Sequence, residues 1–280
     1  MKAVSNTAQR VDNERWGAID KSLLVKALGF SATLLHGDTA VWDRWRWLRR
    51  RLPKTANAEK VIDIGCGTGA FSIGAALRGY DVLGLSWDER NQRVARERAS
   101  LCGARSAKFE VQDVRQLDSR TDLEAGFDVA ICCENIEHII DDRKLIVDIA
   151  ACLKPGGRLL LTTPSYHYRP IGLGDLGPFV EVEDGGHVRR GYTKAMLEEL
   201  CGHANLRLEE VSYCTGYLSQ KAMFVLRALS EIHPLFAWAV ILPFRALPPL
   251  FDHAVGAITH WPYYCICVEA YKPRFRPVGD

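Results

Sequence analysis

Several familiar signatures are missing from this chain of 280 residues. Lysine and arginine number 36 and aspartate and glutamate 34, so the net charge of +2 is too small to indicate a nucleic-acid partner by itself. The nine cysteines are odd in number and none stands in a C-x-x-C pair, which argues against a zinc site and favours free thiols in a reducing, cytoplasmic compartment. No apolar signal-peptide region follows Met1, and the apolar run at residues 234–244 is far shorter than the ~20 residues that span a bilayer. A secreted, disulfide-bonded or membrane-spanning protein is therefore not expected.

The most informative stretch is residues 61–69, which read V-I-D-I-G-C-G-T-G: an apolar strand with one carboxylate, then three alternating glycines. Glycine adopts the angles of a tight strand-to-helix turn without a Cβ clash, and it lets a ligand lie directly on the backbone. The spacing of Gly65, Gly67 and Gly69 is not the G-x-G-x-x-G of dinucleotide folds, and the lysine of a phosphate-binding P-loop is missing. A cationic, amino-acid-bearing ligand therefore fits this turn better than a pyrophosphate, with Asp63 placed to hold its positive group.

From the glycine turn onward, strand-like runs alternate with helical patterns, which predicts a mainly parallel sheet covered by helices on both faces. The turn and this order resemble the class I S-adenosylmethionine-dependent methyltransferases. The resemblance implies an α/β, Rossmann-like fold with seven strands, the last one antiparallel, and S-adenosyl-L-methionine as the cofactor. The expected strands are 60–64, 81–85, 107–111, 127–132, 158–163, 206–213 and 263–271, and the expected helices are 71–78, 90–102, 143–153 and 193–203.

We expect one methyltransferase domain over residues 1–280, because no repeat or low-complexity tract divides the chain. Residues 154–157, K-P-G-G, form a breaker cluster that is expected to close a helix and turn the chain into the next strand. The expected parts are an N-terminal helical segment 1–56, a cofactor-binding core 57–215, an apolar helical insertion 216–260, and a final strand and tail 261–280.

The cofactor is expected at the carboxyl ends of the strands, near the point where the strand order reverses. By resemblance, Asp113 accepts a hydrogen bond from the adenine amino group and Val114 donates its backbone N–H to the ring. The alternative role for Asp113 is a helix cap. The residues expected to contact the cofactor are Asp63, Gly65, Cys66, Gly67, Gly69, Ser86, Trp87, Asp113, Val114 and Cys133.

The second strand departs from the family pattern. Most members end it with an acidic residue that binds both ribose hydroxyls, whereas this chain has Ser86 there. A neutral hydroxyl makes weaker hydrogen bonds than a carboxylate. We expect Trp87 to compensate by stacking on the adenosine, and Asp88 is either an alternative ribose ligand or a helix cap.

A second cluster of polar residues follows the fourth strand, where the chain reads C-E-N-I-E-H-I. If a helix begins there, Glu134, Glu137 and His138 share one face at i, i+3 and i+4. This set, with a later histidine such as His187, resembles that of the ubiquinone-biosynthesis O-methyltransferases and of the small-RNA 2′-O-methyltransferases. The resemblance implies a divalent cation, Mg or Zn, held by these four residues. The alternatives are general-base catalysis by His138 or His187 with Glu134 beside them, and a purely structural role.

Three further regions bear on the acceptor. The connection 164–192 is long and carries aromatic and arginine side chains, which suit a planar, sugar-like or anionic acceptor. The apolar insertion 216–260 suits a cover over the acceptor pocket, and is compatible with interfacial membrane contact or a homodimer. Residues 42–51 interleave tryptophan and arginine like a nucleic-acid binder, but we favour one helix with tryptophans in the core and arginines in water.

These observations favour a methyltransferase that acts on a hydroxyl of a small-molecule acceptor. The alternatives are C- or N-methyl transfer to a lipophilic or isoprenoid acceptor, which Ser86 and the apolar insertion suggest, and a non-catalytic nucleoside-binding protein. Nucleic acid is not favoured as a partner.

Overall fold

The computed structural model describes residues 21–35, 39–171, 175, 177–245 and 248–274. Residues 1–20 of the predicted N-terminal helical segment lie outside the described residues.

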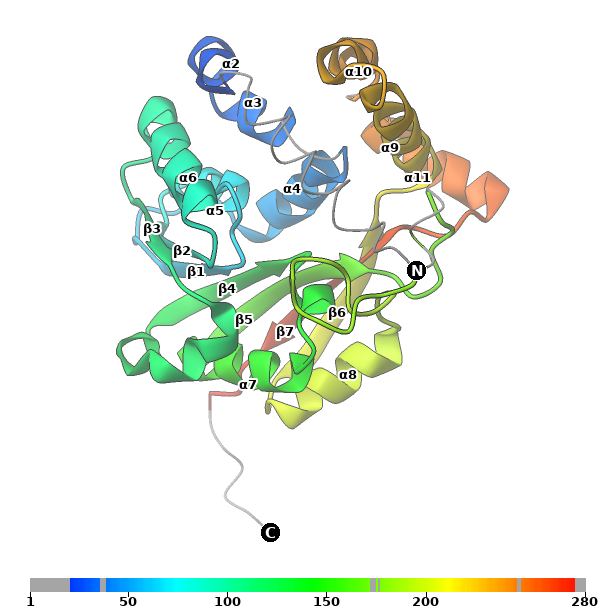
Figure 1. The fold of residues 1–280 in the computed structure, drawn as a ribbon. Helices are drawn as coiled ribbons and strands as arrows, with labels where there is room; N and C mark the ends of the chain where they lie inside the picture. Colours follow the sequence, from blue (N-terminus) through cyan, green and yellow to red (C-terminus); the bar gives the residue numbers. More distant parts are fainter. Residues whose placement is uncertain (1–20, 36–38, 172–174, 176, 246–247, 275–280) are drawn as a thin grey trace.

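A sheet built from seven strands of the described chain forms the centre of the molecule, in the order β3-β2-β1-β4-β5-β7-β6 (Figure 1). β7 runs antiparallel to both β5 and β6, and the other neighbours are parallel. The predicted α/β fold with a mainly parallel sheet and an antiparallel last strand is confirmed. The strands are β1 (Lys60–Ile64), β2 (Asp81–Ser86), β3 (Ala107–Val111), β4 (Phe127–Cys133), β5 (Leu153–Pro164), β6 (Arg207–Cys214) and β7 (Cys265–Tyr271).

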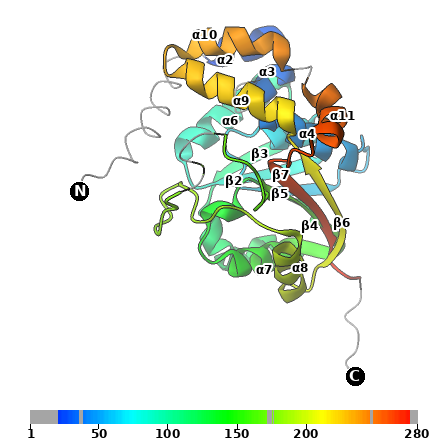
Figure 2. The ribbon, with the colours of Figure 1, turned by 90° about the vertical axis from the view of Figure 1, so that its right-hand side faces the viewer.

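Helices cover both faces of the sheet. In Figures 1 and 2, α7 and α8 lie on one side and the remaining helices on the other. The helices are α2 (Lys21–Leu28), α3 (Phe30–Leu35), α4 (Ala40–Arg51), α5 (Ala70–Ala76), α6 (Glu89–Cys102), α7 (Asp142–Cys152), α8 (Lys194–His203), α9 (Tyr217–Ser230), α10 (Pro234–Ile241) and α11 (Pro248–Thr259).

The apolar pattern of β1 explains why this strand is central. Ile62 and Ile64 belong to the core cluster beneath α7 and α8, whereas Val61 belongs to the cluster on the side of α4 and α5. Successive side chains of a strand point to opposite faces, so a strand buried on both faces reads as one apolar run. The glycine turn that follows β1 is therefore fixed at the carboxyl edge of the sheet.

The predicted turn at residues 154–157 is wrong. α7 already ends at Cys152, and these residues lie inside β5. The pairing of β4 with β5 changes register there, since Phe127 pairs with Leu153 but Val129 pairs with Arg158. A β-bulge accommodates extra residues in one strand and commonly uses glycine, so the breaker residues interrupt the ladder without ending the strand.

Residues 42–51 do form a helix, α4, but one of its arginines departs from the prediction. Trp45 and Trp47 are buried, and Arg49 and Arg50 are exposed, as expected. Arg44, in contrast, is only 6% exposed. The physical reason is a partly buried acidic partner, because Arg44 Nε lies 4.0 Å from Glu134 Oε1.

The insertion between β6 and β7 contains α9, α10 and α11. In the views of Figures 1 and 2 these helices lie on the same side of the sheet as α2, α3 and α4. Among the described residues, none of the helices is long and apolar enough to cross a membrane. All nine cysteines are free thiols.

Candidate functional site at the carboxyl edge of the sheet

The three glycines of the turn have positive φ angles of +76°, +53° and +79°, for Gly65, Gly67 and Gly69 respectively. A Cβ on Gly65 would lie 2.6 Å from side-chain atoms of Asn135. A Cβ on Gly69 would lie 2.8 Å from the ring of Phe109. A Cβ on Gly67 would meet nothing within 4 Å. Two glycines are therefore needed for packing, whereas Gly67 faces open space where a ligand can approach the backbone.

Asp63 lies beneath this turn and is only 1% exposed. The hydroxyl of Ser72, on α5, donates to Asp63 Oδ2 at 2.6 Å. Burial raises the pKa of Asp63 to about 6, which the hydrogen bond from Ser72 only partly offsets. The neighbouring Cys66 is largely enclosed, and burial raises the pKa of its thiol well above the ordinary value.

We expect cofactor affinity to depend on pH through Asp63. Its folded pKa lies above the ordinary value of 3.8, so the carboxylate, which we expect to hold a cationic group of the cofactor, is present above pH 6 and is lost as pH falls through 6. The dissociation constant should be about tenfold higher at pH 5 than at pH 8. Calorimetric titration with S-adenosylhomocysteine checks this. In an Asp63→Asn variant the dissociation constant should no longer change with pH in this range. The same pH dependence in the variant and the parent would contradict the role of Asp63.

The end of β2 presents two residues in different environments. Ser86 is buried at 5% exposure, whereas the Trp87 side chain is 64% exposed. Asp88 is the N-cap of α6, because its side chain accepts a hydrogen bond from the backbone N–H of Arg90. The Asp88 carboxylate also forms an ion pair with the Arg90 guanidinium, at 3.0 Å. Asp88 thus has the capping role that was the alternative to ribose binding.

Replacing Trp87 with alanine should weaken cofactor binding about fivefold or more, because stacking of a base on an aromatic ring contributes roughly 1–3 kcal/mol. An exposed tryptophan has this face available for a ligand. The matched control is Trp87→Phe, which keeps an aromatic face and should retain most of the affinity. Equal affinity of the alanine variant and the parent would remove Trp87 from the site.

In the loop after β3, the carboxylate of Asp113 interacts with a neighbouring residue of the same loop. Asp113 caps the 3₁₀ helix Val114–Ser119 by accepting from the backbone N–H of Arg115, and pairs with the Arg115 guanidinium. The hydrogen bond from Arg115 is the main reason that the pKa of Asp113 is lowered. Val114 is 5% exposed. Arg115 also reaches Glu183, at 2.7 Å, and so connects this loop with the long connection that carries His187.

The predicted helix after β4 is wrong. β4 continues to Cys133, which pairs with Thr162 of β5, and Glu134 then adopts a left-handed φ of +49°. Only a short 3₁₀ turn, Ile136–His138, follows. Glu134 therefore does not share a helix face with Glu137, and its Oε1 instead accepts from the Thr162 hydroxyl at 3.3 Å.

Three of the four predicted residues do come together. Ligand atoms of Glu137, His138 and His187 lie within 4.8 Å of one another, and this group does not include Glu134. The rings of His138 and His187 meet edge to face with centroids 4.7 Å apart. His138 Nε2 lies 3.9 Å from Glu137 Oε1.

Backbone contacts bring the His187 loop to this position. His138 Nδ1 lies 3.0 Å from the carbonyl oxygen of Gly186. Since a carbonyl only accepts, Nδ1 carries the proton and Nε2 presents a lone pair. The N–H of Val188 donates to the Glu137 carbonyl at 2.9 Å.

The charge state of the cluster is unusual. Burial, and then the neighbouring carboxylate of Glu134, raise the pKa of Glu137 well above its ordinary value. Burial and the proximity of His138 lower the pKa of His187 to about 4. Thr163 donates to Glu137 Oε2, but among the described residues Oε1 has no hydrogen-bond partner. An unpartnered oxygen facing an imidazole lone pair fits either a proton on Glu137 or a bound cation, because a buried polar atom is costly without a partner.

The cluster lies next to the glycine turn, because Asn135, between Cys133 and the 3₁₀ turn, is the residue that Gly65 packs against.

A family model described as a methyltransferase domain matches residues 37–211, which include the glycine turn and the histidine cluster. The chain belongs to the methyltransferase family. Its class I, S-adenosylmethionine-dependent character agrees with the resemblance of the glycine motif.

Curated relatives of this methyltransferase include the ubiquinone biosynthesis O-methyltransferase of Leptothrix cholodnii, which is 32% identical over 120 residues, 43% of this chain and 50% of that protein. The protein of the same description from Idiomarina loihiensis is 35% identical over 105 residues, 38% of this chain and 42% of that protein. This methyltransferase thus spans about half the length of the curated relatives it matches.

Among solved structures, phosphoethanolamine N-methyltransferase 2 of Haemonchus contortus in complex with S-adenosyl-L-methionine has a TM-score of 0.59 and 18% identity. The match covers 92% of this chain and 61% of that chain. At 18% identity, this similarity shows only that the two proteins share a fold.

Two features of the methyltransferase site were absent from the sequence prediction. Arg44 approaches Glu134 from α4, and Arg115 bridges Asp113 and Glu183. The sequence signal for Arg44 was weak, because it stands in a row of similar arginines. Arg115 had a clearer signal, since an arginine two residues after a capping aspartate is well placed to pair with it.

Proposed function

We propose that this methyltransferase transfers the methyl group of S-adenosylmethionine to a hydroxyl oxygen of a small-molecule acceptor. The single observation that carries the proposal is the convergence of Glu137, His138 and His187 beside the glycine turn. The curated relatives described as O-methyltransferases support the choice of oxygen.

The chemistry requires alignment and the removal of one proton. The bond between sulfur and the methyl carbon breaks as the bond from carbon to the acceptor oxygen forms, and the sulfur leaves as a neutral thioether. The hydroxyl proton must pass to a base, and a positioned imidazole serves this purpose at neutral pH.

His138 is the better base of the two histidines. Its Nδ1 is occupied by the Gly186 carbonyl, so its Nε2 lone pair is free to accept a proton. His187, with a pKa of about 4, stays neutral near pH 7 and is a weak base. It is suited to packing against His138 and to accepting a hydrogen bond rather than holding the proton.

In the second version of this site, a divalent cation is bound by the cluster. Glu137, His138 and His187 are the residues that would hold it, and the unpartnered Glu137 Oε1 fits such a role. Two imidazoles and one carboxylate suit zinc or another transition metal better than magnesium, which prefers oxygen ligands. When bound, such an ion lowers the pKa of a hydroxyl and orients it.

Removal of metal separates the two versions. We expect methyl transfer to phenolic acceptors to survive exhaustive dialysis against a chelator if His138 acts alone as the base. If a cation is required, activity should fall below detection and return with zinc or manganese but not with magnesium. Calorimetry with S-adenosylhomocysteine on the chelated protein is the control, and a parallel loss of cofactor binding would contradict both versions.

The acceptor class that we propose is a hydroxylated aromatic or lipophilic molecule. The long connection contributes Tyr166, which is 44% exposed, and Arg190, whose guanidinium carbon lies 5.5 Å from the centroid of that ring. Such a pair suits a planar acceptor, because arginine and aromatic faces both stack on flat rings. Transfer to carbon or nitrogen remains the competing proposal.

A further inference from the structure

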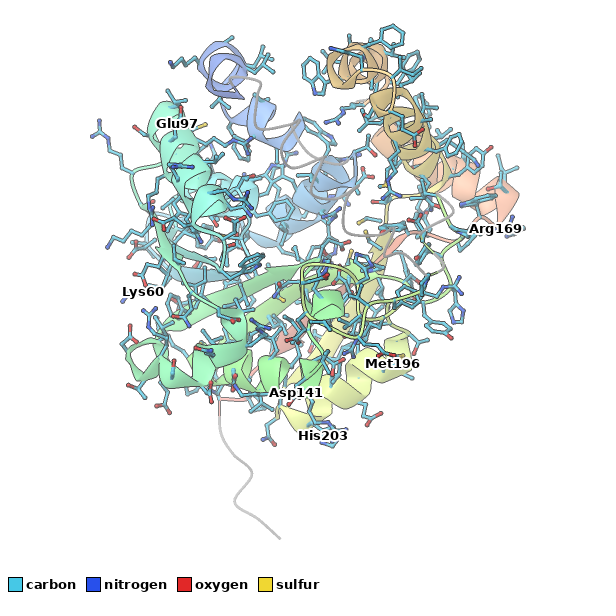
Figure 3. All side chains as sticks on the ribbon, viewed as in Figure 1. Lys60, Glu97, Asp141, Arg169, Met196 and His203 are labelled. Atoms are coloured by element: carbon cyan, nitrogen blue, oxygen red, sulfur yellow. The ribbon has the colours of Figure 1, made fainter. Side chains whose placement is uncertain are left out.

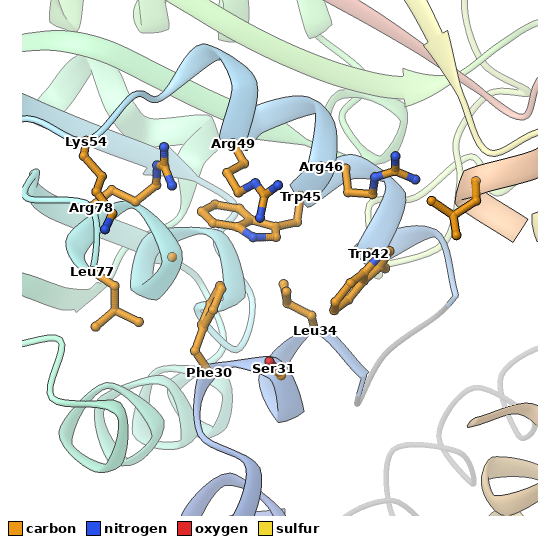
Figure 4. A pocket seen from close by; sticks show the side chains of 12 residues that line it. Phe30, Ser31, Leu34, Trp42, Trp45, Arg46, Arg49, Lys54, Leu77 and Arg78 are labelled. Atoms are coloured by element: carbon orange, nitrogen blue, oxygen red, sulfur yellow. The ribbon is translucent and has the colours of Figure 1, made fainter. Parts of the chain in front are cut away.

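A cavity lies between α3, α4 and α5. Its volume is about 600 Å³, and Figure 4 shows the side chains that line it. Phe30 and Trp45 form an aromatic wall, with their rings edge to face and centroids 5.2 Å apart. Leu34 and Trp42 extend this apolar lining.

The rim of the same cavity is cationic. Arg46, Arg49, Lys54 and Arg78 all line it. Arg78 already donates from Nε to the Leu52 carbonyl. Within the described part of the chain, Arg49 and Lys54 have no carboxylate within ion-pair distance, and both are exposed. These two charges are available to an anionic ligand.

An apolar surface adjoins this cationic cavity. Leu250 of α11 lines the cavity, whereas the next residue, Phe251, lines a groove of about 460 Å³ between α9, α10 and α11. The two features are therefore joined through α11. The exposed large apolar side chains of α10, the following 3₁₀ turn and α11 are Phe236 (52%), Phe244 (55%), Leu250 (65%), Phe251 (53%) and Ile258 (81%).

Negative charge is scarce on this face. The acidic residues of segments 39–54 and 216–260 are Asp43, Glu231 and Asp252. Asp43 and Asp252 are buried, at 7% and 6% exposure, and Asp252 accepts from backbone N–H groups at the start of α9. Glu231 is thus the one exposed carboxylate that these segments contribute within the described residues. A partner that is anionic and apolar at once is complementary to such a face.

We propose that the cationic cavity and the adjoining apolar surface of α10 and α11 dock on a bilayer that contains anionic phospholipids. Each basic side chain near an anionic membrane surface strengthens binding severalfold, and partly inserted apolar side chains add to it. A nucleic acid would account for the rim but not for the five exposed large apolar side chains of α10, the following 3₁₀ turn and α11. A second copy of the chain would bring like-charged rims together. The proposal does not depend on the acceptor or on the site at the carboxyl edge.

The test is co-flotation of the full chain with vesicles. We expect binding to vesicles that contain phosphatidylglycerol, little binding to pure phosphatidylcholine, and a decrease as salt rises. The double variant Arg49→Glu/Lys54→Glu should bind at least about tenfold more weakly. So should Phe236→Ser/Ile258→Ser, which leaves the charges in place.

Matched controls lie on α7 and α8, on the opposite side of the sheet (Figures 1 and 3). Arg143→Glu/Lys194→Glu and Val147→Ser/Met196→Ser change exposed residues there and should bind vesicles like the parent. Circular dichroism verifies the folding of each variant, and methyl transfer to a water-soluble acceptor should be unchanged in Arg49→Glu/Lys54→Glu.

Three results would overturn the proposal. The first is the absence of flotation with phosphatidylglycerol vesicles. The second is equal binding by Arg49→Glu/Lys54→Glu and its control Arg143→Glu/Lys194→Glu. The third is a different occupant, seen as a dimer in light scattering that Phe236→Ser/Ile258→Ser dissociates, or as a nucleic-acid complex that Arg49→Glu/Lys54→Glu abolishes.

Discussion

Gly67→Val is expected to weaken binding of S-adenosylhomocysteine at least about 100-fold, as measured by calorimetry. The Cβ direction of Gly67 is open to at least 4 Å, so a branched side chain would fill the space into which the ligand is proposed to fit. A loss of about 2.7 kcal/mol corresponds to this factor. Its φ of +53° also adds strain for a β-branched residue, of order 1–3 kcal/mol.

Gly103→Val separates these two effects. Gly103 is the C-cap of α6 with a φ of +71°, and a Cβ there also meets nothing within 4 Å. The strain is comparable, so both variants should lose similar thermal stability. Gly103→Val should nevertheless keep cofactor affinity within about threefold of the parent. If both variants lose affinity equally, the effect of Gly67→Val is strain and the cofactor site is wrongly assigned.

His138→Ala is expected to lower kcat by about 10²–10⁴, the usual contribution of a positioned acid or base. Affinity for S-adenosylhomocysteine should stay within about threefold, because the contacts of the His138 ring are with Glu137, His187 and Gly186. Steady-state kinetics with a phenolic acceptor and calorimetry measure the two quantities separately.

His203→Ala is the matched histidine control. His203 lies near the end of α8, on the opposite side of the sheet from α4 (Figure 3), and its ring is paired with Glu199 at 3.6 Å. Its removal should leave kcat unchanged. An unaltered kcat in His138→Ala, or a fall in cofactor affinity that accounts for the lost rate, would give His138 a structural role only.

The sheet could be predicted from sequence because its signals are local and repeated. β1 is an apolar strand with one carboxylate that leads into three glycines, and Thr193 before α8 is a capping residue whose hydroxyl accepts from the Met196 N–H. The prediction of a turn at residues 154–157 was wrong because proline and glycine occur both in turns and in β-bulges. Only the pairing with β4, nearly thirty residues away, distinguishes them.

The candidate site was predicted less completely, for a related reason. Glu134 looks helical in sequence, yet the pairing of Cys133 with Thr162 extends β4 and leaves Glu134 in a left-handed conformation. The burial of Arg44 follows from its approach to Glu134, a partner ninety positions later in the chain. Contacts of this kind depend on the assembled sheet and leave no local pattern.

The glycine turn illustrates the same limit. Gly65 and Gly69 are needed for packing against Asn135 and Phe109, whereas Gly67 is open. In the sequence the three are equivalent members of one motif. Their separate roles follow from residues that other strands bring to the turn.

The fate of a labelled methyl group is the most direct test of methyl transfer to a hydroxyl oxygen. The full chain would be incubated with S-adenosylmethionine carrying a carbon-13 methyl, together with phenols, catechols and matched amines, and the products analysed by NMR and mass spectrometry. We expect a labelled methyl ether on a hydroxyl oxygen, formed in equal amount with S-adenosylhomocysteine and lost in His138→Ala. A label on nitrogen or carbon, or tight cofactor binding with no turnover of any acceptor, would contradict it.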